Sequence, residues 1–310
     1  MKILITGVHG FVGTNLVKAL SKEHFIYGVD IVSPITEGVR FTFSWDYLDK
    51  EGEIPDVDAI IHLAGKAHDT KNQSAADVYF KVNTELTKKI YDYFLAHDSI
   101  KKFIFFSTAK AAADKVDGIL TEDVVPSPKG PYGESKIAAE KYIQEHLVAD
   151  KQVYILRPCM IHGPGNKGNL NLLYGVVKKG IPWPLGAFEN RRTFTSIENM
   201  CFVIDGLLNK DVPTGIYNMG DDEALSTNEL IEEICKSLGK KAHIWKLPKG
   251  LMNGVAKIGG ALHLPLDPER LRKLTENYIS SNTKIKKALG VEKMPVDARE
   301  GLKDTLESFK

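Results

Sequence analysis

Two side chains four positions apart are of the types that could move a proton. Residues 131–136 read PYGESK, so Tyr132 and Lys136 would share one face of a helix. A free phenol has a pKa near ~10 and is a poor base at neutral pH. A neighbouring ammonium group favours the phenolate and can lower that pKa toward the working range. The pair predicts a tyrosine that exchanges protons with a substrate; the simpler alternative is a surface pair, because this spacing is common.

A glycine turn near the N-terminus could hold a dinucleotide. Residues 7–13 read GVHGFVG, between an expected strand and an expected helix. Glycines let the backbone turn tightly and let a pyrophosphate approach the helix N-terminus, where free N–H groups favour anions. The next strand ends at Asp30, whose carboxylate would accept hydrogen bonds from ribose hydroxyls and repel a 2′-phosphate. We therefore expect NAD rather than NADP, unless Asp30 is only a turn residue before Pro34.

The elements that must position these residues alternate between short apolar runs and amphipathic stretches. Strands are expected at residues 2–6, 25–30, 39–43, 59–63, 102–107, 152–157 and 215–219. Helices are expected at residues 11–21, 75–97, 134–149, 197–209, 227–238 and 296–309. Unbroken apolar runs such as residues 103–106 are typical of parallel strands covered on both faces. The alternation predicts an α/β fold, with a doubly wound parallel sheet of the Rossmann type.

The second half is less regular and contains breaker-rich loops at residues 163–168 and 180–186. We expect an NAD-binding domain over residues 1–160 and a smaller, mainly substrate-binding part over residues 161–310. Later segments, at roughly residues 190–220, are expected to return to the first domain.

Composition excludes several classes of protein. The 310 residues carry 41 basic and 40 acidic side chains, a net charge of +1, so no nucleic-acid partner is expected. Cys159, Cys201 and Cys235 are scattered, which argues against a disulfide scaffold or a metal site and is typical of a cytoplasmic protein. No stretch reaches the ~20 apolar residues of a membrane span. Residues 251–266 come nearest and are interpreted as a buried helix plus loop, or else as a segment that rests against a membrane or a partner.

The glycine turn and the YxxxK pair resemble the extended branch of the short-chain dehydrogenase/reductase superfamily. Residues 62–65 read HLAG, similar to the HLAA segment of that branch, with Gly65 as a conservative departure. Asp46 and Tyr47 stand where these proteins contact the adenine, and Asn83 resembles their structural asparagine. The resemblance implies a cofactor site of Gly7, Gly10, Phe11, Val12, Gly13, Asp30, Asp46, Tyr47, Leu63, Ala64, Gly65, Asn83, Ser107, Tyr132, Lys136 and Pro158.

The resemblance also supplies a third catalytic residue. Residues 106–108 read FST, and the second hydroxyl maps onto Thr108, which would bond the sugar oxygen that reacts. Ser107 would cap the strand and line the site. Nucleotide-sugar 4,6-dehydratases carry Asp-Glu directly after this threonine, whereas this chain has Ala109 and Lys110. Dehydration is therefore disfavoured.

The second half matches the same family more loosely. Residues 157–165 read RPCMIHGPG, similar to an RPxxVYGPG segment, and residues 190–199 resemble an arginine-containing segment that binds a diphosphate. The resemblance implies a UDP-sugar substrate. Its expected contacts are Thr108, Lys110, Asn169, Arg192 and Arg270, with Tyr278 near the sugar. Either arginine could instead form a surface salt bridge.

The whole chain resembles UDP-hexose 4-epimerase-like proteins of the NAD-dependent epimerase/dehydratase family. That resemblance implies that Tyr132 takes the proton of the C4 hydroxyl while bound NAD⁺ oxidises C4, and that the 4-keto sugar turns before it is reduced again. A 4-ketoreductase that consumes NAD(P)H needs the same three residues and stays open. A non-catalytic NAD-binding protein is a third reading, disfavoured because Thr108, Tyr132 and Lys136 are all present. Relatives often dimerise through two helices, here residues 75–97 and 134–149.

Overall fold

The computed structural model describes residues 1–50, 52–66, 75–166, 168–262 and 266–310. Its centre is a sheet of seven strands in the order β10-β7-β5-β4-β1-β2-β3, all parallel. The strands are β1 (Lys2–Thr6), β2 (Phe25–Val29), β3 (Val39–Phe43), β4 (Ala59–His62), β5 (Lys102–Phe106), β7 (Gln152–Pro158) and β10 (Gly215–Met219). These agree with the strands predicted from the apolar runs and confirm the Rossmann-type α/β fold.

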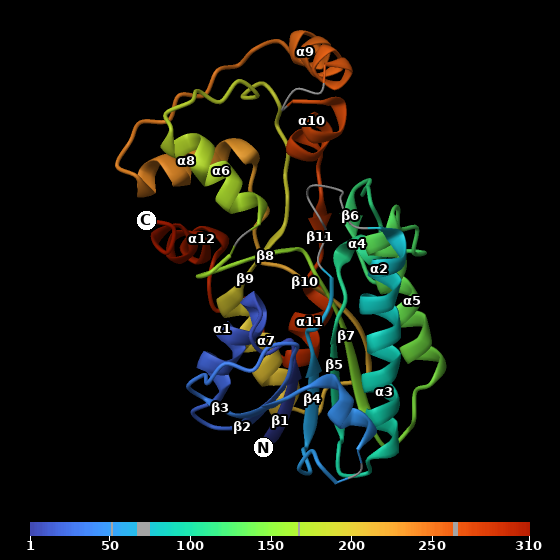
Figure 1. The fold of residues 1–310 in the computed structure, drawn as a ribbon. Helices are drawn as coiled ribbons and strands as arrows, with labels where there is room; N and C mark the ends of the chain where they lie inside the picture. Colours follow the sequence, from blue (N-terminus) through green and yellow to red (C-terminus); the bar gives the residue numbers. More distant parts are fainter. Residues whose placement is uncertain (51, 67–74, 167, 263–265) are drawn as a thin grey trace.

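Helices cover both faces of the sheet, as Figure 1 shows. On one face lie α1 (Phe11–Leu20), α7 (Ile197–Asn209) and α11 (Thr283–Leu289), and on the other α3 (Leu86–Ala96) and α5 (Pro131–Glu145). Each layer has its own apolar core: Leu16 and Val203 pack in the first, and Phe94 and Ile143 in the second. Because both faces are buried, the strand residues Ile3, Leu4 and Ile5 are all fully buried, which explains their unbroken apolar run.

The strand order places the ligand crevice. β2 and β3 lie on one side of β1, whereas β4, β5, β7 and β10 lie on the other. In open parallel sheets a crevice forms at the carboxyl ends of the strands, where the order reverses. Here that point lies between β1 and β4, so the glycine turn after β1 and the segment after β4 face each other across it.

A second lobe lies beyond the carboxyl ends of the strands (Figure 1). It contains α6 (Asn169–Lys178), α8 (Thr227–Ser237), α9 (Lys249–Ala261), α10 (Pro268–Thr275) and α12 (Ala298–Glu307), packed on a separate apolar core. The chain crosses between the lobes more than once, because α7 and β10 return to the sheet after α6 has left it. Two short parallel pairs lie at the junction: β8 (Met160–His162) with β9 (Phe194–Ser196), and β6 (Ile119–Leu120) with β11 (Ile279–Ser280).

Three helical predictions differ in detail from the structure. The helix expected at residues 134–149 begins earlier, at Pro131, and ends at Glu145 (α5). The helix expected at residues 75–97 consists of α2 (Ala76–Phe80), a π-helical turn η2 (Lys81–Glu85) with Asn83 buried on it, and α3. The segment of residues 251–266 does form a helix, α9, but the expected burial is wrong for one of its faces, where four apolar side chains are exposed. Residues 263–265 of that segment and residue 167 of the glycine-rich loop lie outside the described residues. Among the helices that are described, none has the length and hydropathy that would let it cross a bilayer.

Candidate active site

The glycine turn leaves no room for a side chain at Gly7 or Gly13. Gly7 has φ +70°, and a Cβ added there would lie 2.9 Å from the amide nitrogen of Ala64. A Cβ on Gly13 would lie 2.5 Å from the carbonyl oxygens of Gly7 and Val8. Gly10 is the N-cap of α1 and makes no side-chain cap, so the first amides of α1 stay available to an anion. The backbone thus forms a cradle of the kind that a pyrophosphate fits, with Phe11 and Val12 in the first turn of the helix.

The carboxylate of Asp30 lies beside this turn. One carboxylate oxygen accepts a hydrogen bond from the amide of Ile31 at 2.7 Å, and the other accepts one from the amide of His9 at 3.1 Å. These two bonds hold the carboxylate at the carboxyl end of β2, beside the cradle. It is only partly buried, so its remaining lone pairs are available to ligand hydroxyls.

The segment after β4 forms the facing wall. The amides of Leu63 and Ala64 both bond to Thr6, at 3.1 Å to its carbonyl oxygen and 3.1 Å to its hydroxyl. A Cβ on Gly65 would lie 3.1 Å from Nζ of Lys136, a contact tighter than most in proteins. Glycine therefore leaves space beside the Lys136 ammonium group.

Asn83 connects this wall to helix α5. Its side chain is fully buried on η2 and bonds to both backbone groups of Lys66, at 2.7 and 3.1 Å. Its amide also donates to the hydroxyl of Ser135 on α5 at 3.0 Å. π-Helical turns frequently occur at functional sites, and this one turns the asparagine inward.

The residues expected near the adenine lie on a short 3-10 helix, η1 (Trp45–Asp49). Asp46 is exposed and bonds to the hydroxyl of Ser44 and, at 2.9 Å, to Nζ of Lys50. These two partners lower the pKa of Asp46 to about 2, so it carries a negative charge at neutral pH. The ring of Tyr47 packs at a tilt against Phe43, and Nζ of Lys50 lies 4.2 Å from its centre. Pro158 is the last residue of β7.

The three predicted catalytic residues come together at the start of two helices. Thr108 caps α4 (Ala109–Ala112), where its hydroxyl accepts from the amide of Lys110 at 3.3 Å. Tyr132 lies in the first turn of α5, half-buried, with the hydroxyl of Thr108 close enough to lower its pKa. Burial raises the pKa of Tyr132, the Thr108 hydroxyl works against that rise, and the ring of Tyr79 packs edge-on at 6.3 Å.

Lys136 lies one turn further along α5. Its Nζ donates to the carbonyl oxygen of Phe106 at 2.8 Å and lies 4.9 Å above the ring of Phe105. Burial lowers its pKa to about 8, although the Glu140 carboxylate opposes that change. The ammonium group is therefore largely charged at neutral pH and is held at the end of β5.

A buried ion pair that sequence reasoning missed supports this lysine. Glu140 follows Lys136 by one turn and bonds to Arg157 of β7, with 2.6 Å between Oε2 and Nη2. Both side chains are fully buried. The hydroxyl of Ser107, expected to line the cofactor site, donates to Glu140. The i, i+4 spacing of Lys136 and Glu140 was the available signal for this group.

Toward the second lobe, a charged cluster borders Thr108. Nζ of Lys110 bonds to the carbonyl oxygen and, at 3.2 Å, to a carboxylate oxygen of Asp114, and it lies 4.7 Å above the ring of Tyr278. Arg272 of α10 also reaches Asp114, at 3.3 Å. Arg270, the predicted ligand, is largely exposed on the same helix beside Asp267.

Of the other two predicted substrate residues, Arg192 lies next to this cluster and Asn169 lies apart from it. Arg192 is half-buried and pairs with Tyr278 in a backbone bridge, and its guanidinium donates to the carbonyl oxygen of Lys273. Asn169 is exposed at the first residue of α6. The sequence predicted Arg270 as a ligand, whereas the structure brings Arg272 to the Lys110 cluster. The two arginines lie half a helical turn apart on α10, a difference that a loose alignment does not resolve.

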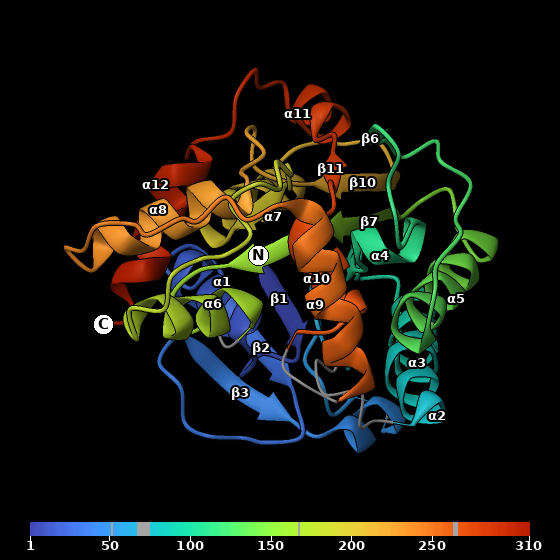
Figure 2. The same ribbon diagram turned by 90° about the horizontal axis from the view of Figure 1, so that it is seen from above.

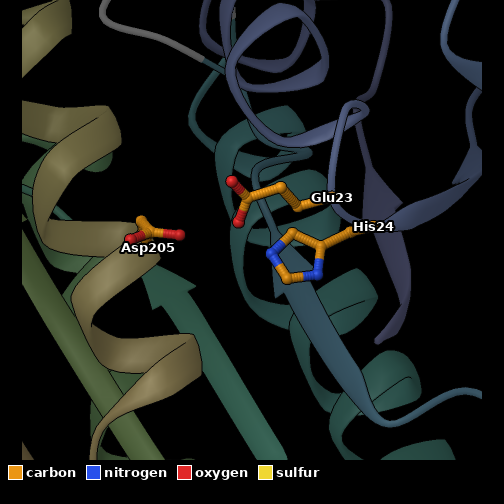
Figure 3. Close-up of side chains that lie close together, drawn as sticks. All are labelled: Glu23, His24 and Asp205. Atoms are coloured by element: carbon orange, nitrogen blue, oxygen red, sulfur yellow. The ribbon is translucent and has the colours of Figure 1, made fainter.

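One group of possible metal ligands lies at the other end of the sheet, near the amino ends of the strands. Atoms of Glu23, His24 and Asp205 lie within 4.8 Å of one another, between the end of α1 and α7 (Figure 3). His24 directly precedes β2, at the amino end of the strands, whereas Tyr132 lies at their carboxyl ends. The cluster is therefore no part of the active site, and the expectation that the site holds no metal stays a prediction.

Comparisons with known proteins agree with this geometry. Residues 3–220 match the NAD dependent epimerase/dehydratase family, and the chain belongs to that family. It is 32% identical to UDP-glucose 4-epimerase of Vibrio cholerae over 99% of this chain and 95% of that protein. The chain is thus an NAD-dependent enzyme of the extended short-chain dehydrogenase/reductase type, and its cofactor is NAD.

More distant relatives have other activities. The chain is 27% identical to N-acetyl-alpha-D-glucosaminyl-diphospho-ditrans,octacis-undecaprenol 4-epimerase of Escherichia coli O157:H7, over 92% of this chain and 84% of that protein. It is 24% identical to GDP-6-deoxy-D-mannose reductase of Pseudomonas aeruginosa, over 74% and 78%. Among solved structures, UDP-glucuronic acid 4-epimerase of Bacillus cereus in complex with NAD has the same fold: TM-score 0.75, 22% identity, and coverage of 100% of this chain and 98% of that one.

Proposed function

We propose that this chain is a UDP-hexose 4-epimerase that acts through a transient 4-keto sugar. The observation that carries this proposal is the buried Thr108 hydroxyl beside the half-buried Tyr132, with Lys136 one turn away and held at the end of β5. The next positions on α4 are Ala109 and Lys110, so the carboxylic acid and base of a dehydratase are absent there. The similarity to the Vibrio cholerae enzyme supports the same reading.

The residues of this chain would divide the work as follows. The hydroxyl of Thr108 bonds to the C4 oxygen and orients it toward Tyr132. Tyr132 accepts the proton of the C4 hydroxyl and later returns it, while the Lys136 ammonium stabilises the phenolate. NAD, when bound in the glycine cradle, supplies the reversible oxidation of C4. Lys110, Asn169, Arg192 and Arg270 are proposed to hold the UDP-sugar, with Arg272 as a further candidate beside Asp114.

The Asp30 carboxylate favours an epimerase over an enzyme that consumes NADPH. It would repel a 2′-phosphate, and net biosynthetic reductions usually draw on NADPH. A 4-ketoreductase remains the second candidate, because the chain is also similar to a GDP-6-deoxy-D-mannose reductase and the same three residues serve both reactions.

A product assay tests the proposal. The protein is incubated with UDP-galactose and, separately, with UDP-N-acetylgalactosamine, with a trace of NAD⁺ and no reductant, and the nucleotide sugars are separated by chromatography. We expect the C4 epimer of at least one of them, which would also identify the accepted substituent at C2. Oxidation of NAD(P)H on a 4-keto-sugar nucleotide, without any epimer in the first assay, would establish the reductase instead.

A further inference from the structure

Helix α9 presents an apolar face that no described residue covers. The exposed fractions of Leu251, Val255, Ile258 and Leu262 are 54%, 44%, 61% and 64%. At 3.6 residues per turn these positions fall within about 60° of arc, so they form one stripe. The other side of the helix is buried, because Met252 and Ala256 pack into the core of the second lobe.

The segment that carries this stripe is strongly basic in sequence. Residues 240–262 contain five lysines and no Asp or Glu, whereas the whole chain is nearly neutral at +1. The lysines, all exposed, are Lys240, Lys241, Lys246, Lys249 and Lys257. In the part of the chain that the structure describes, none of them forms an ion pair. Trp245, in the segment that leads to α9, is 54% exposed.

We infer that α9 docks on the surface of an anionic lipid bilayer. An interfacial helix needs an apolar stripe that enters the acyl boundary and flanking lysines that contact anionic headgroups, and aromatic side chains commonly lie at the interface. α9 has 13 residues, so it lies along a surface rather than crossing a membrane. This inference does not depend on the proposed epimerase activity.

Charge complementarity decides between this occupant and a second copy of the chain. A two-fold interface through α9 would place the same lysines of both copies against each other, without acidic residues in the segment to balance them. An anionic bilayer instead neutralises all of them. α9 packs on α10, whose Arg272 contacts Asp114 next to Lys110 (Figure 2). Docking would therefore hold the substrate side of the active site near the membrane surface.

Sedimentation with sucrose-loaded vesicles tests the inference. We expect the protein to sediment with vesicles of equal parts phosphatidylcholine and phosphatidylglycerol, to stay in solution with phosphatidylcholine alone, and to be released by high salt. The double variant Leu251→Glu/Ile258→Glu should bind at least about tenfold more weakly, because two apolar anchors become negative charges. Phe41→Glu is the matched control: Phe41 is 53% exposed on β3, at the other end of the molecule in Figure 1, and its replacement should leave binding unchanged.

Two further measurements make the result decisive. Circular dichroism and NAD binding establish that each variant is folded, and Lys249→Glu/Lys257→Glu should weaken vesicle binding while leaving the apolar stripe in place. Equal binding by the α9 double variant and the unmodified chain would overturn the inference. Failure of the unmodified chain to sediment with anionic vesicles would also overturn it. If, in that case, the Leu251→Glu/Ile258→Glu variant had a lower mass in analytical ultracentrifugation than the unmodified chain, a second copy would cover α9.

Discussion

At the scale of single residues, the site depends on groups whose charge is set by burial. Lys136 is buried and Tyr132 is half-buried, and burial raises the pKa of the phenol and lowers the pKa of the ammonium group. The Thr108 hydroxyl opposes the first change, and the Glu140 carboxylate opposes the second.

Replacement of Tyr132 by phenylalanine removes the proposed base without changing the shape of the pocket. We expect Tyr132→Phe to lower kcat by two or more orders of magnitude, roughly the contribution of general acid–base catalysis, and to leave the Kd for NAD⁺ unchanged. Turnover is measured by product formation and NAD⁺ binding by calorimetry. Near-normal turnover would contradict the role of Tyr132.

Asp30 is expected to select the cofactor. Asp30→Ala removes the negative charge beside the cradle, so the preference for NAD⁺ over NADP⁺ should relax by at least about tenfold. Binding of both dinucleotides is measured for the variant and for Asp49→Ala, an exposed carboxylate change on η1. An unchanged ratio of the two dissociation constants would show that Asp30 does not contact the ribose.

The pH dependence of activity should follow the protonation state of Lys136. The pKa of Lys136 is lowered to about 8, so its positive charge is present below that pH and is lost as pH rises through it. Loss of the charge weakens support for the phenolate, and kcat/KM should therefore fall above about pH 8. Profiles from pH 6 to about 10 are compared with circular dichroism at each pH to exclude unfolding. A flat profile through this range would contradict the prediction.

At the scale of elements, helix α5, which carries Tyr132 and Lys136, is fixed from both sides. Asn83 attaches α5 to the segment after β4, and the Glu140–Arg157 pair attaches it to β7. Apolar runs and YxxxK spacing predicted these strands and this helix, because such patterns are local. The Glu140–Arg157 pair and Arg272 were not predicted, since they depend on which segments meet in space. α9 was predicted only in part: its glycines weaken the helical signal, and its apolar residues do not reveal which face is covered.

Removal of one partner of the buried ion pair should be costly. Glu140→Gln leaves the Arg157 guanidinium buried without a counter-charge, and we expect the free energy of unfolding to fall by about 3–5 kcal/mol. Urea denaturation measures it. Glu145→Gln, an exposed change on the same helix, should alter stability by less than about 0.5 kcal/mol. Similar values for the two variants would show that the pair does not stabilise the fold.

At the scale of the whole molecule, α2, α3 and α5 form one outer layer, and this is where a homodimer interface is predicted. Val78 and Phe80 of α2 are exposed apolar side chains on that layer. If the layer pairs with a second copy, Phe80→Arg should convert a dimer to a monomer in analytical ultracentrifugation, whereas Phe41→Arg on β3 should not. A monomeric unmodified chain, or a dimer that survives Phe80→Arg, would contradict the prediction.

The position of β10 at the end of the sheet has a consequence for synthesis of the chain. β7 (Gln152–Pro158) lies between β5 and β10, but β10 follows it by more than fifty residues, at Gly215–Met219. While the ribosome adds the intervening segment, one edge of β7 has no strand beside it, and its backbone amides and carbonyls are open to another nascent chain. Completion of the nucleotide-binding sheet thus waits for residue 219, after the first helix of the second lobe has been made.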